Sequence, residues 1–222
     1  MTYGLARVAA NPLALLLVLF VLLLALPAHL DARPRIVALG DSLTAGYGLE
    51  QGEGLVPQLQ RWLDDHGAPG FKVVNRGVSG DTTAGGRARF EWAMSDGARA
   101  VVLELGANDM LRGIDPAETR ANMDAMLAGL AARDLPVLLV GMRSTGNFGP
   151  EYKRAFDAIY PELAEQYGTV FDPYFFEGVV GEPVYFQDDG LHPSAAGITR
   201  IVERLGPLVL LLIARIEPGA DQ

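Results

Sequence analysis

The chain has 222 residues, of which 50% are hydrophobic and 20% are charged, and its formal net charge at pH 7 is −9. This length suits one compact domain. Because 18 Lys and Arg residues stand against 27 Asp and Glu residues, we expect no nucleic-acid partner. The absence of cysteine excludes a thiol nucleophile, a zinc–thiolate site, a disulfide scaffold and cysteine acylation. Much of the mean hydropathy of +0.19 comes from one apolar block, residues 13–26, so a polytopic membrane protein is excluded as well.

The N-terminal segment has the pattern of a secretory signal. Arg7 precedes the apolar block, whose 14 residues would span about 21 Å as a helix. The hydrocarbon core of a bilayer is roughly 30 Å thick, so the block is short for a membrane span. We therefore predict a signal peptide, or alternatively a retained N-terminal anchor, over residues 1–32, and a single domain over residues 33–222. In either case we expect that domain to be periplasmic or secreted.

Five short apolar runs bounded by Gly or Pro predict β-strands. None of them alternates between apolar and polar residues, which indicates strands that are covered on both faces. The runs are residues 36–39, 73–74, 101–105, 137–140 and 169–171. Segments with helical spacing lie between them, and strands that alternate with helices form a parallel sheet. The sequence thus predicts a three-layer α/β/α domain.

Capping residues indicate where two of the helices begin. Asp115 followed by Pro116 predicts a helix start, with the aspartate as N-cap and the proline in the first turn. Ser194 is a candidate N-cap of the last helix, in which Pro207 predicts a kink or a break. We expect the apolar tail, residues 208–213, to pack on the core rather than to contact a membrane, because exposed patches of that kind are uncommon.

The first predicted strand leads into a glycine-rich segment, residues 40–48, that contains Ser42. Parallel α/β sheets bind their ligands at the carboxyl ends of the strands, which is where this segment lies. The segment lacks the G-x-G-x-x-G fingerprint of dinucleotide sites and the Gly-Lys-Ser/Thr of a Walker loop. Two interpretations of Ser42 remain. It is a helix N-cap, or it is a nucleophile at a helix start, where free N–H groups and the helix dipole favour negative charge.

Two further segments at strand ends offer hydrogen-bond donors. After the second strand, the glycines Gly77 and Gly80 either serve a turn or, because glycine has no Cβ, let a backbone N–H approach a developing oxyanion. After the third strand, Asn108 either forms an Asx-turn or donates its side-chain amide to such an oxyanion. Both alternatives are compatible with these residues alone.

One histidine stands out as a candidate catalytic base. Of the 3 histidines, His29 lies in the N-terminal segment and His66 at a helix exit, which leaves His192. The carboxylate of Asp189, three residues earlier, can reach Nδ1 of His192 within one turn. Asp188 is the alternative residue for this carboxylate role. A neutral imidazole can accept a serine proton and later donate it to a leaving group, while a carboxylate holds the ring. No H-E-x-x-H motif or His-rich cluster occurs, so we expect no metal and no organic cofactor.

Four segments, taken in order, resemble the sequence blocks of the SGNH (GDSL) hydrolase family. They are Gly-Asp-Ser-Leu at 40–43, Gly80, Gly-Ala-Asn-Asp at 106–109 and Asp-Gly-Leu-His at 189–192. The resemblance extends over about residues 35–210 and is strongest to the small bacterial periplasmic acyl-CoA thioesterase, arylesterase and lysophospholipase enzymes. A single GDSL motif is weak, but four blocks that each follow a predicted strand are specific.

The resemblance implies a fold and a set of roles. The fold is flavodoxin-like, with five parallel strands in the order 2-1-3-4-5. Ser42 is then the nucleophile, His192 the general base and acid, and Asp189 the carboxylate that orients it. The oxyanion hole is formed by the backbone N–H groups of Ser42 and Gly80 and by the side-chain amide of Asn108.

The resemblance also implies a place for the acyl chain of the substrate. The family has a mobile loop beside the acyl pocket, which corresponds to residues 110–114, and a second pocket wall, which corresponds to residues 142–148. The substrate-binding residues expected from these two segments are Met110, Leu111, Ile114 and Phe148. Plain core packing is the alternative for the methionines, because Met fills irregular gaps readily. The polypeptide is expected to be a monomer.

The function implied is serine-dependent hydrolysis of acyl esters and thioesters through an acyl-enzyme, with a small-molecule ester or thioester as the substrate. An envelope carbohydrate O-acetylesterase is the first alternative, and a non-catalytic binding module on the same scaffold is the second. The chain departs from the family pattern at Arg76-Gly77-Val78 before the second block and at residues 143–148 after the fourth strand. The second departure affects the shape of the acyl pocket and therefore the preferred chain length.

Overall fold

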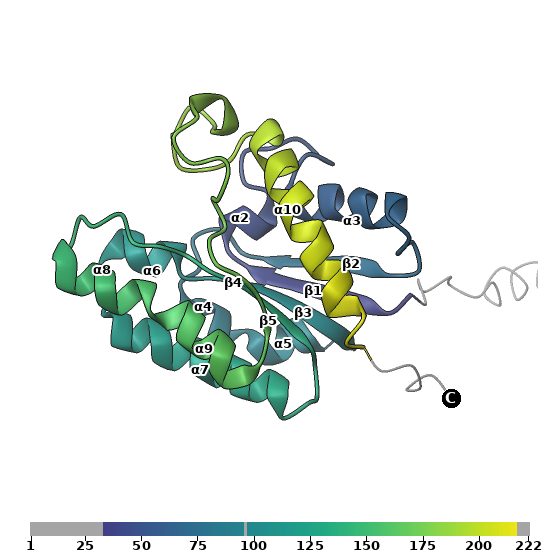
Figure 1. Ribbon diagram of the computed structural model, residues 1–222, viewed down its shortest axis with the longest axis horizontal. Helices are drawn as coiled ribbons and strands as arrows, with labels where there is room; N and C mark the ends of the chain where they lie inside the picture. The colour runs from purple at the N-terminus through teal and green to yellow at the C-terminus, as the bar shows by residue number, and fades with distance from the viewer. Residues whose placement is uncertain (1–32, 96, 217–222) are drawn as a thin grey trace, which may run out of the picture. The chain divides into compact units, whose positions relative to one another are not determined.

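The computed structural model describes residues 33–95 and 97–216 of the chain (Figure 1). The predicted signal peptide or anchor, residues 1–32, lies outside the described residues. Among the described helices, none is both long enough and apolar enough to cross a membrane.

A five-stranded parallel sheet forms the centre of the domain (Figure 1). Its strand order is β2-β1-β3-β4-β5, so the predicted three-layer fold and the predicted order 2-1-3-4-5 are confirmed. The strands are β1 (Arg35–Gly40), β2 (Lys72–Gly77), β3 (Ala98–Glu104), β4 (Val137–Val140) and β5 (Val170–Asp172). All five predicted strands are present, although β2 is considerably longer than the apolar pair Val73-Val74 that revealed it.

The burial of the strands explains their apolar sequences. Every residue of β4 is buried, and in β1 only Arg35 is not. A strand covered on both faces cannot alternate between apolar and polar residues, because neither face meets water. Strand β2 pairs with one edge of β1, and the chain then crosses back so that β3 pairs with the other edge of β1. The carboxyl ends of β1 and β3 are therefore the topological switch point, where α/β sheets bind ligands.

Helices cover both faces of the sheet (Figure 1). Two helices, α3 (Leu55–Asp65) and α10 (Ala195–Ile213), pack against each other on one face. The other face is covered by α4 (Thr83–Ala88), α5 (Phe90–Met94), α7 (Pro116–Ala131) and α9 (Ile159–Tyr167), with α8 (Gly149–Asp157) packed on α7 and α9. Three short elements lie in the connections: α2 (Ser42–Ala45), α6 (Ala107–Arg112) and the 3₁₀ turn η1 (Pro183–Tyr185).

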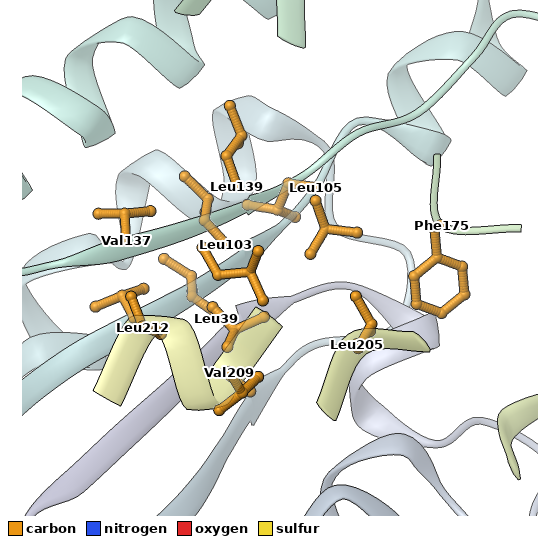
Figure 2. Packing of buried hydrophobic residues seen from close by; sticks show 14 of the residues in the cluster. Leu39, Leu103, Leu105, Val137, Leu139, Phe175, Leu205, Val209 and Leu212 are labelled. Atoms are coloured by element: carbon orange, nitrogen blue, oxygen red, sulfur yellow. The ribbon is translucent and has the colours of Figure 1, made fainter. Parts of the chain in front are cut away.

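The C-terminal helix supplies part of the hydrophobic core. Figure 2 shows the side chains of Leu39 and Leu103 from the sheet near those of Leu205, Val209 and Leu212 from α10. All five side chains are at most 1% exposed. Burial of a leucine or valine side chain stabilises a fold by about 1.5–3 kcal/mol. The apolar C-terminal segment therefore packs on the core, as predicted.

The predicted helix starts are confirmed by their capping bonds. The side chain of Asp115 accepts a hydrogen bond from the N–H of Ala117 at 2.9 Å, with Pro116 as the first residue of α7. The hydroxyl of Ser194 accepts a bond from the N–H of Gly197 at 3.2 Å at the start of α10. Each bond satisfies a backbone donor that has no partner within its own helix.

Of the two expectations for Pro207, a kink or a break, the break does not occur, since α10 continues through this residue to Ile213. Two features of the preceding residue, Gly206, explain the difference. A proline ring disfavours helical backbone in the residue before it partly by contact with that residue's Cβ, which glycine lacks. The ring of Trp62 also packs directly on Gly206, so contact with α3 holds the helix at this point.

Candidate active site

The side chains of Ser42, His192 and Asp189 meet at the carboxyl end of β1. Nε2 of His192 lies 2.9 Å from Oγ of Ser42, although the two residues are 150 positions apart. Nδ1 of the same ring lies 2.6 Å from Oδ2 of Asp189. The three groups form a hydroxyl–imidazole–carboxylate chain, an arrangement through which a proton can leave the serine.

The turn after β1 makes Ser42 the first residue of α2. Asp41 is the N-cap of this helix, and its Oδ1 accepts a hydrogen bond from the N–H of Leu43 at 3.0 Å. The interpretation of Ser42 as the N-cap is therefore wrong, because Asp41 occupies that position. Gly46, with a left-handed φ of 85°, ends the helix after a single turn. The hydroxyl of Ser42 is thus left to interact with His192.

Asp189 organises the tight turn that carries His192. Its Oδ1 accepts hydrogen bonds from the N–H groups of Leu191 at 2.9 Å and His192 at 3.0 Å. Gly190, between Asp189 and Leu191, has a φ of 66°. The bond from the His192 ring, followed by these two backbone bonds, lowers the pKa of Asp189 to about 2. Asp189 and not its neighbour Asp188 makes the bond to the imidazole, and it is ionised at neutral pH.

Two residues beside the imidazole were not singled out from the sequence. The ring of Tyr47 is tilted by 38° against that of His192, with a centroid distance of 4.6 Å. Gln187 donates from Nε2 to the carbonyl oxygens of Tyr47 at 2.8 Å and Pro193 at 3.0 Å. This amide ties the loop after α2 to the segment that carries His192. The glycines around Tyr47 indicate a turn, but no spacing in the sequence indicates its contact with a residue so distant in the chain.

Asn108, in α6, connects two segments that border Ser42. Its Nδ2 donates to Oδ2 of Asp41 at 3.0 Å and to the carbonyl oxygen of Asp81 at 2.9 Å. These partners are 67 and 27 residues away in the chain, so the NH₂ group links distant segments. Within the described part of the chain, no backbone N–H donates to Oδ1 of Asn108, as an Asx-turn would require. The side chain lies between the residue before Ser42 and the residue after Gly80.

Two backbone donors at this end of the sheet are unused. Within residues 33–95 and 97–216, the N–H groups of Ser42 and Gly80 donate no hydrogen bond to another protein atom. Gly80 has a left-handed φ of 84°, a conformation that suits glycine. A backbone N–H that has no partner inside the protein is available to an oxygen atom of a ligand.

Two carboxyl groups are buried beneath the turn that carries Ser42. Asp41 and Glu104 are both 0% exposed. Burial raises the pKa of Asp41 to about 6, and burial together with the negative charge of Asp41 raises the pKa of Glu104 well above its ordinary value. Thr44 in α2 donates from Oγ1 to Oε2 of Glu104 at 2.8 Å. The raised pKa favours the neutral acid form of Glu104, which supports α2 without repelling Asp41.

A cavity of about 360 Å³ opens beside Ser42 and His192. Its walls are mainly apolar and come from the segments that follow β1, β3, β4 and β5. The lining side chains other than Ser42 and His192 include Met110, Leu111, Met142, Tyr174, Phe176, Val180, Phe186 and Leu191. A largely apolar wall beside a polar reacting group is suited to an acyl chain or an aromatic ring.

Of the four predicted substrate-binding residues, Met110 and Leu111 line this cavity, whereas Ile114 and Phe148 do not. The helix α6 reaches the cavity and ends at Gly113, so Ile114 comes after the turn that closes it. Phe148 packs its ring on Gly113, with Cζ 2.8 Å from where a Cβ would be, and it also contacts the ring of Tyr152. Ile114 and Phe148 therefore lie outside the wall of this cavity, in contrast to Met110 and Leu111.

The described residues contain no group of three or more His, Asp and Glu side chains placed to hold a metal ion. At the site itself the structure brings together a hydroxyl, an imidazole and a carboxylate.

Comparison with known proteins assigns the chain to a family. A sequence model of the GDSL-like lipase/acylhydrolase family matches residues 38–200. The chain therefore belongs to this family, and the prediction of an SGNH (GDSL) hydrolase is confirmed.

Individual relatives are similar over most of their length. The chain is 39% identical to esterase TesA of Pseudomonas aeruginosa, over 82% of this chain and 90% of the relative. It is 37% identical to thioesterase 1/protease 1/lysophospholipase L1 of Escherichia coli K12, over 79% of this chain and 83% of the relative. The crystal structure of AlinE4, an SGNH-hydrolase family esterase, has a TM-score of 0.69 at 41% identity and covers 84% of this chain and 98% of that one.

Proposed function

We propose that this chain hydrolyses acyl esters and thioesters through an acyl-enzyme, with Ser42 as the nucleophile. In this proposal His192 is the general base and acid, and Asp189 orients it. The observation that carries the proposal is the continuous hydrogen-bonded chain, with 2.9 Å from Ser42 to His192 and 2.6 Å from His192 to Asp189. The class of reaction agrees with the family of lipases and acylhydrolases to which the chain belongs, and with relatives named as an esterase and a thioesterase/lysophospholipase.

Acylation begins when Oγ of Ser42 attacks the carbonyl carbon of the substrate and Nε2 of His192 takes its proton. Asp189 accepts the hydrogen bond from Nδ1, which keeps Nε2 as the acceptor and stabilises the imidazolium that forms. The carbon–oxygen or carbon–sulfur bond then breaks, and His192 donates the proton to the departing alcohol or thiol. A water molecule attacks the acyl-serine, His192 takes its proton and returns it to Oγ, and the carboxylic acid leaves.

Negative charge develops on the carbonyl oxygen of the substrate during both attacks. We assign its stabilisation to the N–H groups of Ser42 and Gly80 and to the side-chain amide of Asn108. The two backbone donors are free to serve this oxygen. Both hydrogens of the Asn108 amide already have acceptors in Asp41 and Asp81, so this group contributes by sharing one of them with the oxyanion.

The apolar cavity supports an acyl chain as the bound part of the substrate. A sugar site would be expected to present several polar side chains toward hydroxyl groups, whereas the walls here are formed mainly by methionine, leucine, valine and aromatic residues. Acyl ester and thioester hydrolysis is therefore favoured over deacetylation of a carbohydrate. The filled nucleophile, base and carboxylate positions equally favour an enzyme over a binding module.

The sequence also supports proposals about the localisation, domain organisation and partners of the enzyme. Residues 1–32, with Arg7 ahead of the apolar block, are proposed to direct residues 33–222 to the periplasm or the exterior as one domain. The net charge of −9 argues against nucleic acid as a partner, and the domain is proposed to act as a monomer.

The proposed nucleophile can be tested with a fluorophosphonate and an aryl ester. Ser42→Ala is expected to lower kcat by about 10⁶-fold and to abolish labelling, because no other group replaces the attacking oxygen. Ser95→Ala, a change at an exposed serine whose hydroxyl donates only to the carbonyl of Trp92, is the matched control and should behave as wild type. Wild-type hydrolysis by the folded Ser42→Ala protein would refute the mechanism.

A further inference from the structure

Arg89 binds three separate segments that border the site. It lies between α4 and α5. Its Nη2 donates to the carbonyl oxygen of Gly40 at 2.8 Å, its Nη1 to that of Arg76 at 2.7 Å, and its Nε to Oδ2 of Asp81 at 2.6 Å. One guanidinium group thus connects the end of β1, the end of β2 and the segment that contains Gly80.

These bonds depend on the shape and charge of arginine. The side chains of Arg89 and Asp81 are only 16% and 18% exposed, so water has limited access to their ion pair. Charge-assisted hydrogen bonds in such surroundings are stronger than those between neutral groups. The planar guanidinium holds its donors in a fixed fork, whereas the single nitrogen of lysine cannot reach three acceptors in those directions.

The same network leads to the proposed oxyanion donors. The carbonyl oxygen of Gly40 also accepts the N–H of Val78 at 3.0 Å, and the N–H of Asp81 donates to the carbonyl oxygen of Val78 at 3.1 Å. The carbonyl oxygen of Asp81 in turn accepts the amide of Asn108 at 2.9 Å. Gly80 lies within this loop, which Arg89 holds against the strand that leads to the nucleophile.

We infer that Arg89 is a positioning residue that fixes the Gly80 segment and the Asn108 amide relative to Ser42. This inference rests on the proposed function, because the position of these donors matters only if an oxyanion forms there. Arg89 does not line the cavity beside Ser42, so its role concerns the transition state and not the affinity for substrate. Stabilisation by prearranged donors requires them at about 2.7–3.1 Å from the developing charge, and small displacements of a loop weaken it.

The first test replaces Arg89 by lysine, which keeps the positive charge and removes the fork. We expect kcat, expressed per serine labelled by a fluorophosphonate, to fall about 10- to 100-fold, with KM within about twofold of wild type. The rate of labelling itself should fall by a similar factor, because phosphonylation also places an oxygen in the oxyanion hole. Arg87→Lys is the matched control, since Arg87 is exposed in the same segment and bonds only to Asn122, and its kinetics should remain those of wild type.

A second variant keeps the inference testable if Arg89→Lys does not fold. Asp81→Asn retains an acceptor oxygen and removes the charge opposite Nε, so it loosens one of the three connections. We expect kcat per labelled serine to fall about 3- to 10-fold with an unchanged KM. Thermal unfolding of both variants shows whether each is folded at the assay temperature. A fall in kcat in a folded variant then reports on the position of the oxyanion donors.

Two outcomes would overturn the inference. The first is a folded Arg89→Lys protein whose kcat per labelled serine equals that of wild type. If Arg89→Lys does not fold, the same result for Asp81→Asn overturns the inference. The second is a loss of activity that comes entirely from a rise in KM. Neither outcome affects the proposed function, which fails only if Ser42→Ala remains active or Ser42 is not labelled in the wild-type enzyme.

Discussion

The amide nitrogen of Asn108 lies 3.0 Å from Oδ2 of Asp41, the residue directly before the proposed nucleophile. The other carboxylate oxygen of Asp41 accepts the N–H of Leu43 and caps α2. One buried carboxylate therefore fixes both the helix that begins with Ser42 and the amide assigned to the oxyanion hole. This double role leads to two predictions.

The first prediction concerns turnover in Asp41→Asn. An asparagine has only one acceptor oxygen, so either Leu43 or Asn108 would face an NH₂ group instead of an acceptor. We expect kcat to fall about 10- to 100-fold with little change in KM, less than the 10²–10³-fold typical for outright loss of an oxyanion donor. Steady-state kinetics with an aryl ester checks this. Asp65→Asn, at the exposed end of α3, is the control, and an equal effect in both variants would contradict the prediction.

The second prediction concerns pH and stability. Burial raises the pKa of Asp41 to about 6 from 3.8, so between these values the folded state binds more protons than the unfolded state. The contribution of Asp41 to the free energy of unfolding must then fall as pH rises from about 4 to above 6, by about 3 kcal/mol. Denaturant unfolding of wild type and Asp41→Asn at pH 4 and pH 7 tests this. A wild-type-minus-variant difference that does not change with pH would exclude it.

The third prediction separates the two neighbouring carboxylates. Asp189→Asn should lower kcat about 10³- to 10⁴-fold, because an amide opposite Nδ1 neither favours the required tautomer nor stabilises an imidazolium. Asp188→Asn should leave kcat within about twofold of wild type. The low pKa of Asp189, about 2, also sets how its contribution to the free energy of unfolding depends on pH. This contribution is favourable and fully present above about pH 4, and it is lost only as pH falls toward 2. A comparable loss of kcat in both variants would exclude the assignment of Asp189.

The sequence was most informative where periodicity and capping act locally. The short, mainly apolar runs predicted all five strands, because strands covered on both faces carry few polar residues. Asp115 and Ser194 indicated helix starts by the chemistry of capping. The strand order and the roles within the site came from the resemblance to a family and not from periodicity. The break at Pro207 does not occur, since the local rule for proline does not include the contact of Trp62 with Gly206.

Long-range hydrogen bonds to backbone oxygens could not be predicted from the sequence. Arg89 binds the carbonyl oxygens of Gly40 and Arg76, and any residue type could supply such an acceptor. The contact of Tyr47 with His192 likewise depends on how two distant loops meet. The placement of Phe148 outside the cavity depends on the packing of its ring on Gly113. Each of these contacts follows from tertiary structure, which no spacing of residues encodes.

The fourth prediction concerns chain length. Val180 lines the cavity and is 59% exposed, so a larger side chain can enter the cavity at little cost to the core. Val180→Trp should lower kcat/KM for a long-chain acyl ester about tenfold relative to an acetyl ester, since apolar contacts of this size typically discriminate by 10–200-fold. Val184→Trp is the control, because Val184 is 68% exposed and lies outside the cavity lining. If both variants changed the ratio of kcat/KM for the two esters equally, the cavity wall at Val180 would not determine the preferred acyl chain length.

The fifth prediction concerns the support of α2 from beneath. Gly77 ends β2, and a Cβ there would overlap the backbone nitrogen of Ala45 and approach the Cα of Ala45 to 2.7 Å and the carbonyl oxygen of Asp41 to 2.8 Å. These atoms belong to α2 and its N-cap, so no side-chain rotation can relieve the contact and the helix itself must move. We expect Gly77→Ala to lower stability by about 1–3 kcal/mol and to reduce kcat/KM at least tenfold, because the displaced helix carries Ser42 away from His192.

Gly70→Ala is the matched control, since a Cβ at Gly70 meets no atom within 4 Å. Kinetics and thermal unfolding of the two variants measure the effect directly. If Gly77→Ala retained both wild-type stability and wild-type turnover, the turn after β1 would be adaptable rather than fixed by close packing. The 2.9 Å hydrogen bond between Ser42 and His192 would then have to be maintained by the His192 segment alone.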